Sequence, residues 1–406
     1  MYTSVVFYTR YAFLALKEAL PKQSVLVLTG MRRTGKTAIL RQLYSETLDN
    51  KIFLDLENRI NHEAFLLADY DQIWGRLREN FGLDAKKMAY VFLDEVQNLP
   101  VLPSIVKYLV DHYKVKFVLT GSASFYLKNL FSESLSGRKR LFELFPLTFC
   151  EFLVFKGRKT NLPIKSFDLG NIKKIESDQA LYQTDYEEYL RFGGFPGVVM
   201  IKNEAEKTLE LKEILYSYID QDVKKLADFS KIEALESLVR LLASRVGQKL
   251  QVEKLSGEIG LARETVNNYL DFLEKTYLIA RIAPFSKSPD RELSKAKKLY
   301  FCDSGMANVL GQLSAGQLLE NAIFNNLRVK YQFDKAFTGI NFFQKKSGVE
   351  IDFMLEDKYG IEVKVTAGKS DWSKLVRLTS ELKIKSPILI SQNKTVFPGA
   401  IYASQV

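Results

Sequence analysis

The chain has 406 residues, of which 47% are hydrophobic and 26% charged, and its formal net charge is +10. This length predicts about two to four domains with ordinary cores, while only two cysteines and two histidines exclude a disulfide framework and argue against a zinc or His-rich metal site. The basic excess favours a polyanionic partner over an unengaged basic surface, and the lack of a long apolar run or leader predicts a cytoplasmic protein without a membrane partner.

A helix is expected over residues 1–21, then an apolar strand at 25–28 and an amphipathic helix at 38–48. Between strand and helix lies Gly30–Thr37, which reads G-x-x-x-x-G-K-T. In this strand–loop–helix context the pattern is typical of P-loop NTPases, because the glycines let backbone amides surround phosphates and the helix N-terminus adds positive potential. The alternative is a chance match in a glycine-bearing turn.

The motif predicts an ATP site with Mg²⁺. Lys36 is expected to reach the β- and γ-phosphates, and the Thr37 hydroxyl to bind Mg²⁺. The residues expected to contact the nucleotide are Gly30, Met31, Arg32, Arg33, Thr34, Gly35, Lys36, Thr37 and Ala38.

A second strand at 51–56 and helices at 62–69 and 72–80 precede a third strand at 90–95, which ends in Asp94 and Glu95. A strand followed by Asp-Glu is the Walker B pattern. Asp94 would hold Mg²⁺ through water, and Glu95 would polarise the attacking water. An acidic pair at a strand end is common in itself, so the assignment depends on the upstream phosphate loop.

A helix at 101–113 and a strand at 116–122 follow. Ser122 is our candidate to sense the γ-phosphate, with a strand-to-helix cap as the alternative. Arg138, ahead of a strand at 139–144, is a candidate arginine finger for its own site or for a neighbour in a homo-oligomer; the alternative is a solvated basic cluster. Alternating strands and helices predict an α/β fold with a doubly wound parallel sheet.

Several short segments resemble the AAA-type (AAA+) ATPases of bacteria and archaea, more narrowly those that carry a C-terminal domain of unknown function. They are Gly30–Thr37, Leu93–Gln97, Leu119–Ser122, Ser136–Arg138, Phe145–Phe149 with Glu151, and Arg191–Pro196. The resemblance covers essentially the whole chain and implies ATP hydrolysis. In the family picture Gly193–Pro196 belongs to a helical region after the ATPase core; the residues alone predict a tight turn without chemistry.

Helices are expected at 181–191 and 202–227, and Asp220 and Asp222 on the second of these most simply face solvent. Three further helical segments, at 235–244, 252–257 and 263–275, precede two short strands at 278–284 and 298–301. Two helices joined by a Gly-containing turn and followed by two strands predict a winged helix.

The connection between those strands is basic and would bind DNA phosphates without reading sequence. A winged helix that mediates only protein contacts is the alternative. The cations of the connection are Arg281, Lys287, Arg291, Lys295, Lys297 and Lys298, and the polar residues placed to face a groove are Arg263, Thr265, Asn267 and Asn268.

The C-terminal part is expected to form a helix at 318–330, a strand at 348–355 and a return strand at 361–365. Glu320 lies on the helix, Asp352 on the first strand, and Glu362 and Lys364 share one face of the second. This order resembles the PD-(D/E)XK nuclease core. The three carboxylates would bind a second Mg²⁺ or Mn²⁺, and Lys364 would position or deprotonate the nucleophilic water. A silent domain that only binds partners is the alternative.

We therefore expect four parts: an AAA-type P-loop ATPase domain (1–160), a helical lid or linker (161–230), a winged helix (231–300) and a nuclease-like α/β domain (301–406). The leading function is Mg²⁺-dependent ATP hydrolysis coupled to DNA binding, and metal-dependent cleavage is a further step that the C-terminal fold alone does not imply. The alternative is a nucleotide-switched regulatory or scaffold protein with a catalytically silent C-terminal domain.

Overall fold

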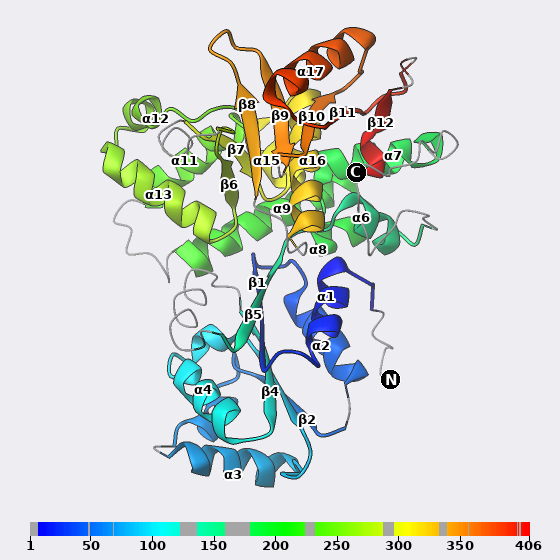
Figure 1. Ribbon diagram of the computed structural model, residues 1–406. Helices are drawn as coiled ribbons and strands as arrows, with labels where there is room; N and C mark the ends of the chain where they lie inside the picture. The colour runs from blue at the N-terminus through cyan, green and yellow to red at the C-terminus, as the bar shows by residue number, and fades with distance from the viewer. Residues whose placement is uncertain are drawn as a thin grey trace. The chain divides into compact units, whose positions relative to one another are not determined.

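The computed structural model (Figure 1) divides into unit 1, Met1–Phe145 with Ser217–Asp228, and unit 2, Pro146–Tyr216 with Phe229–Val406. The four-part division expected from the sequence is finer than these units and stays a prediction. The structure describes residues 7–47, 49–67, 69–121, 135, 137–158, 179–223, 232–286, 296–332, 339–355, 357–395, 397 and 399–406, with only the backbone of 179–181.

Unit 1 is built on a five-stranded sheet in which every pair of neighbours is parallel, so the expected parallel sheet is confirmed. The strand order is β2-β3-β4-β1-β5, which places β1 between β4 and β5. The chain leaves β1 toward one edge and later returns to its other side, and ligands bind at such a switch point. The strands are β1 (Val25–Gly30), β2 (Lys51–Asp55), β3 (Ala89–Asp94), β4 (Val115–Gly121) and β5 (Lys139–Leu144).

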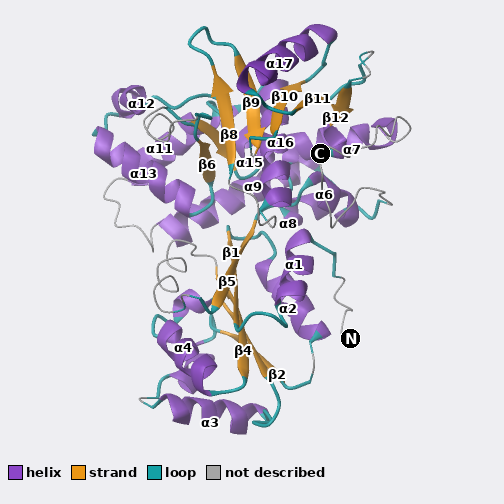
Figure 2. Cartoon of the chain, in the orientation of Figure 1, coloured by secondary structure: helices purple, strands orange, loops and turns teal. Residues whose placement is uncertain are grey.

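Helices cover both faces of this sheet, with α2 and α4 on opposite sides in Figure 2. Every residue of β1 is buried, as expected for a central parallel strand. The helix expected at 62–69 is instead the 3-10 helix η1 (Arg59–Phe65), because the Asn58 side chain caps an earlier start by accepting from the Ile60 amide. The α-helices are α1 (Tyr11–Ala19), α2 (Lys36–Glu46), α3 (Tyr70–Phe81) and α4 (Leu102–His112).

In unit 2 a five-stranded mixed sheet has the order β12-β11-β10-β9-β8. The first three strands in sequence pair antiparallel, and the last three pair parallel. The expected strand at 348–355 starts two residues late because Gly348 has a φ of 87° in the turn before it. The strands are β8 (Ile340–Gln344), β9 (Glu350–Leu355), β10 (Tyr359–Lys364), β11 (Ser386–Ser391) and β12 (Ala400–Tyr402).

The helices expected near 181–191, 235–244, 252–257, 263–275 and 318–330 are present in unit 2, whereas the one expected at 202–227 ends at Tyr218 and is followed by a π-helix. Among the described residues, no helix is long and apolar enough to cross a membrane. The helices are α6 (Phe149–Phe155), α7 (Gln179–Phe192), α8 (Pro196–Met200), α9 (Glu204–Tyr218), α11 (Ile232–Ala243), α12 (Val252–Ile259), α13 (Arg263–Lys275), α15 (Ser304–Gly311), α16 (Ala315–Tyr331) and α17 (Lys369–Leu382). The last two residues of α9 belong to unit 1, where the π-helix η4 (Ile219–Val223) follows.

A small sheet follows α13. Strands β6 (Ile279–Ile282) and β7 (Lys298–Phe301) pair antiparallel, as expected for the two short strands. The segment before α12 joins them, since the Gly247 amide donates to Leu299 O at 2.8 Å and the Leu250 amide to Lys297 O at 2.9 Å. Beyond β6 the chain meets β8 through a bridge between Pro284 and Phe342, so the small sheet continues into the larger one.

The Arg191–Pro196 segment forms the tight turn that its glycines predict. The Asp303 carboxylate accepts from the amides of Gly194 at 2.7 Å and Met306 at 2.9 Å. Gly193 has a φ of 74°, and a Cβ on it would lie 2.0 Å from Asp303 Oδ1. The segment therefore has a structural role: it holds the end of α7 against the start of α15.

Candidate nucleotide site and C-terminal carboxylate cluster

The predicted phosphate loop connects β1 to α2 in unit 1. Gly30 ends β1 with a φ of 151°, and a Cβ there would lie 2.2 Å from the carbonyl oxygen of Leu144 on β5. Only glycine therefore lets the loop start this close to the neighbouring strand. Gly35 is the N-cap of α2, so the amides of that helix's first turn face the loop.

A buried arginine that the sequence gave no reason to single out holds this loop. Arg10 Nη1 donates to Thr34 O at 2.7 Å, and Nη2 donates to Phe145 O at 2.9 Å. Arg10 thus fixes the loop against the chain that leaves β5. A lone basic residue before an apolar helix carries no pattern that predicts this contact.

Lys36 is 5% exposed, and its ammonium donates to the carbonyl oxygens of Gly30 and Met31, both at 2.9 Å. Burial lowers the pKa of Lys36, although the carboxylates of Glu95 and Asp222 act in the opposite direction. A buried ammonium held by neutral carbonyls is incompletely compensated, and it is suited to a phosphate oxygen.

Asp94 ends β3 and lies beside Thr37. Its Oδ1 accepts from the Thr120 hydroxyl. Burial raises the pKa of Asp94, and hydrogen bonds from the Thr120 and Thr37 hydroxyls offset this only in part. The Thr37 hydroxyl and the Asp94 carboxylate are therefore two neighbouring oxygen ligands of the kind that Mg²⁺ prefers.

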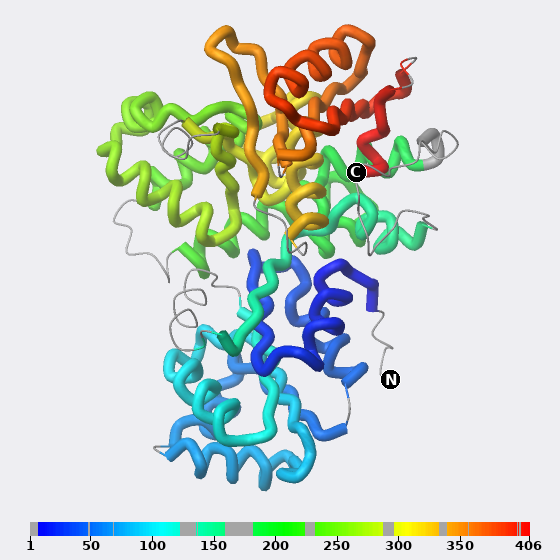
Figure 3. Tube along the Cα trace, in the orientation of Figure 1, coloured from blue at the N-terminus to red at the C-terminus, as the bar shows by residue number. Residues whose placement is uncertain are grey.

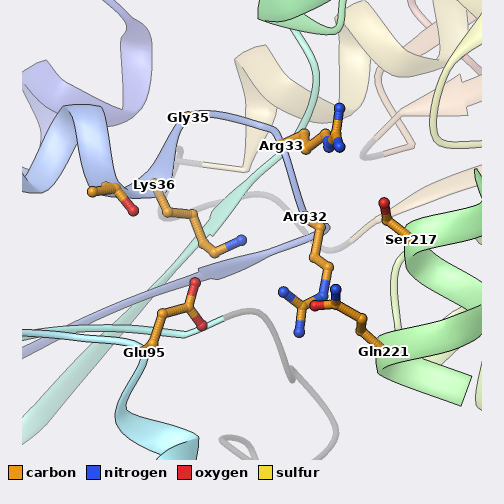
Figure 4. A pocket seen from close by; sticks show the side chains of 8 residues that line it. Arg32, Arg33, Gly35, Lys36, Glu95, Ser217 and Gln221 are labelled. Carbon is orange, nitrogen blue, oxygen red and sulfur yellow. The ribbon is translucent and has the colours of Figure 1, made fainter. Parts of the chain in front are cut away.

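Glu95 follows Asp94 in a left-handed conformation, with a φ of 54°. For a residue other than glycine this conformation costs about 1–3 kcal/mol and is concentrated at functional sites. Its Oε2 accepts from Gln97 Nε2 at 2.5 Å. Figure 4 shows the side chains of Lys36 and Glu95 approaching one another from the loop and from the end of β3.

These groups face a pocket of about 350 Å³. Ser217 and Gln221 lie across the pocket from the loop (Figure 4). Both belong to the 217–228 segment, by which the chain returns to unit 1. The lining residues are Arg32, Arg33, Gly35, Lys36, Thr37, Glu95, Ser217 and Gln221.

Asp222 corrects the expectation that this helical segment faces solvent. It is 4% exposed, and Arg32 Nε donates to its two carboxylate oxygens at 3.0 and 3.1 Å. Burial raises the pKa of Asp222 to about 6 against the opposing effects of Arg32 and Lys36. The turn is buried because Ile219 and Val223 pack inward, and their apolar spacing was the overlooked signal.

Ser122 and Arg138 were also predicted for this site. Ser122 lies outside the described residues. Arg138 Nε pairs with Asp111 Oδ1 at 2.6 Å, and its carbonyl accepts from the amide of Val25, the first residue of β1. The phosphate loop begins at the other end of β1, five residues later and about 16 Å away at strand spacing. Arg138 therefore does not reach the loop of its own subunit, and action on a neighbour stays a prediction.

Two cations expected to bind DNA phosphates are neutralised inside unit 2. Arg281 Nη2 donates to Asp271 Oδ1 and Glu274 Oε2, both at 2.6 Å. Lys298 is 2% exposed. The expectation that these two side chains face nucleic acid is wrong, because both form ion pairs with carboxylates. Lys287, Arg291 and Lys295 lie outside the described residues.

Lys298 is the centre of a group that we call the Lys298 cluster: the buried Lys298 and Asp352 with the half-buried Glu320 and Glu350. Its Nζ lies 3.1 Å from Glu320 Oε1, 3.4 Å from Glu350 Oε1 and 3.9 Å from Asp352 Oδ1. Burial disfavours the charged lysine, but the three carboxylates together raise its pKa. The Tyr300 hydroxyl also donates to Glu320 Oε1, at 2.7 Å.

Beside this cluster, Glu362 Oε1 accepts from Lys364 Nζ at 2.7 Å and from Lys374 Nζ at 3.2 Å. Burial and then the neighbouring Asp352 raise the pKa of Glu362. The structure thus brings the four predicted residues of this site together, but with lysine ammoniums among them. Within the described residues, no group of three His, Cys, Asp or Glu side chains is placed to hold a metal ion. A second metal stays a prediction.

Three family models match consecutive parts of the chain. The model described as an AAA domain matches residues 22–153, a domain of unknown function (DUF8612) matches 183–317, and a domain of unknown function (DUF4143) matches 315–403. The first match agrees with the parallel sheet and the phosphate loop of unit 1. The chain therefore carries an AAA-type P-loop ATPase domain.

Similar proteins share most of the chain's length. The uncharacterized protein MJ1544 of Methanocaldococcus jannaschii is 29% identical over 349 residues, which cover 84% of this chain and 74% of that protein. An uncharacterized protein of Haemophilus influenzae is 27% identical, covering 81% and 79%. Among solved structures, the Walker-type ATPase PABY2304 of Pyrococcus abyssi has a TM-score of 0.47 at 14% identity, covering 75% of this chain and 96% of that one. The assignment of the ATPase domain rests on the family match.

Proposed function

We propose that this protein binds and hydrolyses ATP with Mg²⁺ and couples this reaction to nucleic-acid binding by unit 2. One observation carries the enzymatic part: Lys36, Thr37 and Glu95 line one pocket of unit 1 at the carboxyl ends of β1 and β3, and the Thr37 hydroxyl hydrogen-bonds to Asp94. In open α/β sheets this is where ligands bind.

The donors present fit a triphosphate. The first-turn amides of α2 and the Lys36 ammonium supply positive potential, and the Thr37 hydroxyl with the Asp94 carboxylate would hold Mg²⁺. Bound Mg²⁺ would neutralise charge on the phosphate oxygens. Glu95 would orient the attacking water and accept its proton, because its carboxylate reaches the pocket from the end of β3.

The test is the variant Glu95→Gln, which keeps the side chain's shape and removes its basicity. We expect it to bind ATP while turning over at least about 10²-fold more slowly, the usual loss for a general base. Glu79→Gln, on the exposed side of α3, is the matched control and should hydrolyse ATP at the wild-type rate. Equal rates for Glu95→Gln and wild type would overturn the proposed role of Glu95.

Nucleic-acid binding by unit 2 is supported by the net charge of +10 and by the order of its elements. Helices α11, α12 and α13 are followed by strands β6 and β7, which the 247–250 segment joins, and this order of elements supports the predicted winged helix. Asn267 and Asn268 on α13 are exposed. Binding of labelled DNA to the full chain tests this part, and no saturable binding at low salt would refute it.

For the C-terminal sheet we propose a silent nuclease-like site rather than a cutting one. The support is that Lys298, Lys364 and Lys374 neutralise the carboxylates that would otherwise hold a metal. Supercoiled plasmid incubated with the protein and Mg²⁺ or Mn²⁺ should therefore stay intact. Cleavage by wild type that disappears in Asp352→Ala would instead establish the metal-dependent nuclease.

A further inference from the structure

We infer that a cleft in unit 2 holds a phosphodiester strand of nucleic acid; this inference rests on the proposed nucleic-acid binding and gives it a place. The cleft, which we call the lysine cleft, has a volume of about 480 Å³. It lies where the small β6–β7 sheet meets β8. Its lining residues are Lys249, Pro284, Ala296, Phe342, Gln344, Lys345, Lys346 and Gly348.

The lysine cleft is formed by segments far apart in the sequence. Lys249 comes from the segment before α12, Ala296 from the residues before β7, and Lys345 and Lys346 from the turn between β8 and β9. Backbone hydrogen bonds fix this junction: the Phe285 amide donates to Phe342 O at 2.5 Å, and the Phe342 amide to Ala283 O at 3.1 Å. Figure 3 follows the chain through these segments, with the β8–β9 turn in orange. The cleft is therefore built by the fold, not by one mobile lysine.

The charges around the cleft are unbalanced. Its described lining holds three lysines and no aspartate or glutamate. Lys345 pairs with Glu381, and Gln344 donates to Glu350. Lys249 and Lys346 are exposed and form no ion pair with any described residue. Two ammonium groups thus remain for an anionic ligand.

Part of the cleft lining is apolar. Pro284 and Phe342 contribute to it, and the ammonium of Lys298 lies 5.6 Å from the centroid of the Phe342 ring. An apolar surface in a cleft that also holds exposed lysines suits a sugar or a base, with the lysines available to the neighbouring phosphates. A volume of this size fits a unit of one strand rather than the width of a duplex.

Exposure of the lysines favours a polyanion over a small anion. A solvated ion pair contributes only about 0–1 kcal/mol, so one free phosphate gains little from Lys249 and Lys346. A nucleic-acid strand gains more, because each neutralised phosphate releases condensed counterions. The cleft also replaces the surface expected from the sequence, since Arg281 and Lys298 are committed to carboxylates inside the protein.

The test compares Lys249→Ala/Lys346→Ala with Lys369→Ala/Lys385→Ala in the full chain. The second pair removes the same charge from exposed lysines that do not line the cleft. The probe is a short fluorescein-labelled single-stranded DNA, titrated by anisotropy over about 50 to 200 mM salt. We expect the cleft variant to bind about 3- to 10-fold more weakly, and its salt slope to fall by about 1.4, at about 0.7 per lost phosphate contact. The control should match wild type.

Unchanged affinity and slope in the cleft variant, or an equal loss in the control, would overturn the lysine cleft while leaving nucleic-acid binding by unit 2 intact. No binding by wild type would refute both. If wild type binds AMP saturably and Lys249→Ala/Lys346→Ala does not, the cleft is a mononucleotide site, and the proposal that it holds a nucleic-acid strand is overturned. ATP hydrolysis, measured on the same samples, should be equal in all variants without DNA, because the lysines of the cleft are in unit 2.

Discussion

Lys36 in unit 1 and Lys298 in unit 2 are both almost fully buried, but their neighbours differ. Lys36 donates to two neutral carbonyl oxygens, and burial lowers its pKa. Lys298 lies among three carboxylates, which raise its pKa in spite of burial. A buried cation that contacts no carboxylate among the described residues is prepared for a ligand, whereas one that already contacts its anions stabilises the fold. The charges around a buried lysine therefore distinguish a ligand-binding lysine from a structural one better than its burial does.

The largest expected effect concerns Lys298, the structural lysine of unit 2. Lys298→Met removes the cation and leaves Glu320, Glu350 and Asp352 without it, so the free energy of unfolding should fall by about 3–5 kcal/mol. Urea unfolding of the full chain measures this. Lys385→Met, at an exposed position, is the control and should change little. A loss below about 1 kcal/mol for Lys298→Met would show that the cluster does not depend on its lysine.

The same substitution at Lys36 should change stability little and ATP binding strongly. Lys36→Met removes an incompletely compensated charge, so the thermal midpoint without nucleotide should stay the same or rise. Affinity for ATP should fall at least about 100-fold, or about 2.7 kcal/mol. Calorimetric titration with ATP and a thermal scan of the same sample check both. Strong destabilisation with ATP binding retained would place Lys36 with the structural lysines.

A further experiment asks whether the ammonium of Lys298 stands where a metal ion would. In Lys298→Ala the three carboxylates are left to a cation from solution, so millimolar Mn²⁺ should stabilise this variant by about 1–2 kcal/mol through linkage to the folded state. The parent with Lys298 should not respond. Both proteins carry Asp94→Asn, so that the predicted nucleotide-site metal does not contribute. Stabilisation of both by Mn²⁺ would support a metal site coexisting with the lysine.

The smallest effect concerns Asp222. Its pKa is about 6, so it is ionised at pH 8, where it holds Arg32 and repels phosphate. Asp222→Asn should therefore bind ATP about 3- to 10-fold more tightly at pH 8, an effect of about 1 kcal/mol. The ratio to wild type should approach one as the pH falls through 6, because the wild-type carboxyl then gains its proton. Taking the ratio removes the titration of ATP itself. A ratio independent of pH would refute the role of this carboxyl.

The raised pKa of Asp222 also makes the stability of the folded state depend on pH. The folded state holds this proton more tightly than the unfolded state, so the contribution is fully present below the ordinary pKa of 3.8 and is lost as the pH rises through about 6. Asp222→Asn should remove that part of the pH dependence. Thermal midpoints of both proteins between these pH values measure it.

The sequence predicted the parts of unit 1 whose evidence is local. The phosphate loop, Asp94 and Glu95 lie at the ends of apolar strands, and the alternation of strands and helices specified a parallel sheet. The same holds for the hairpin of β9 and β10, where Glu362 and Lys364 share a face. In each case residues a few positions apart determine the geometry.

Contacts between distant segments could not be predicted. Arg32 and Asp222 are 190 positions apart, and Lys298 and Glu350 are 52 apart. A lysine at the start of a short strand reads as a surface cation, because nothing near it in sequence reveals three carboxylates on α16 and β9. The expectation of a DNA-binding wing failed at Arg281 and Lys298 for this reason.

The return of residues 217–228 to unit 1 has a consequence for how this gene can be dissected. The ATPase unit is not one uninterrupted stretch of coding sequence, because the chain passes between the units after positions 145, 216 and 228. A truncated protein ending at residue 160 would keep both Walker motifs and lose Ser217, Gln221 and Asp222. Conversely, any displacement of those residues by nucleotide would be transmitted along covalent bonds in both directions, to α9 on one side and toward α11 on the other. Residues 217–228 are thus part of the ATPase unit and are joined covalently to unit 2 at both of their ends.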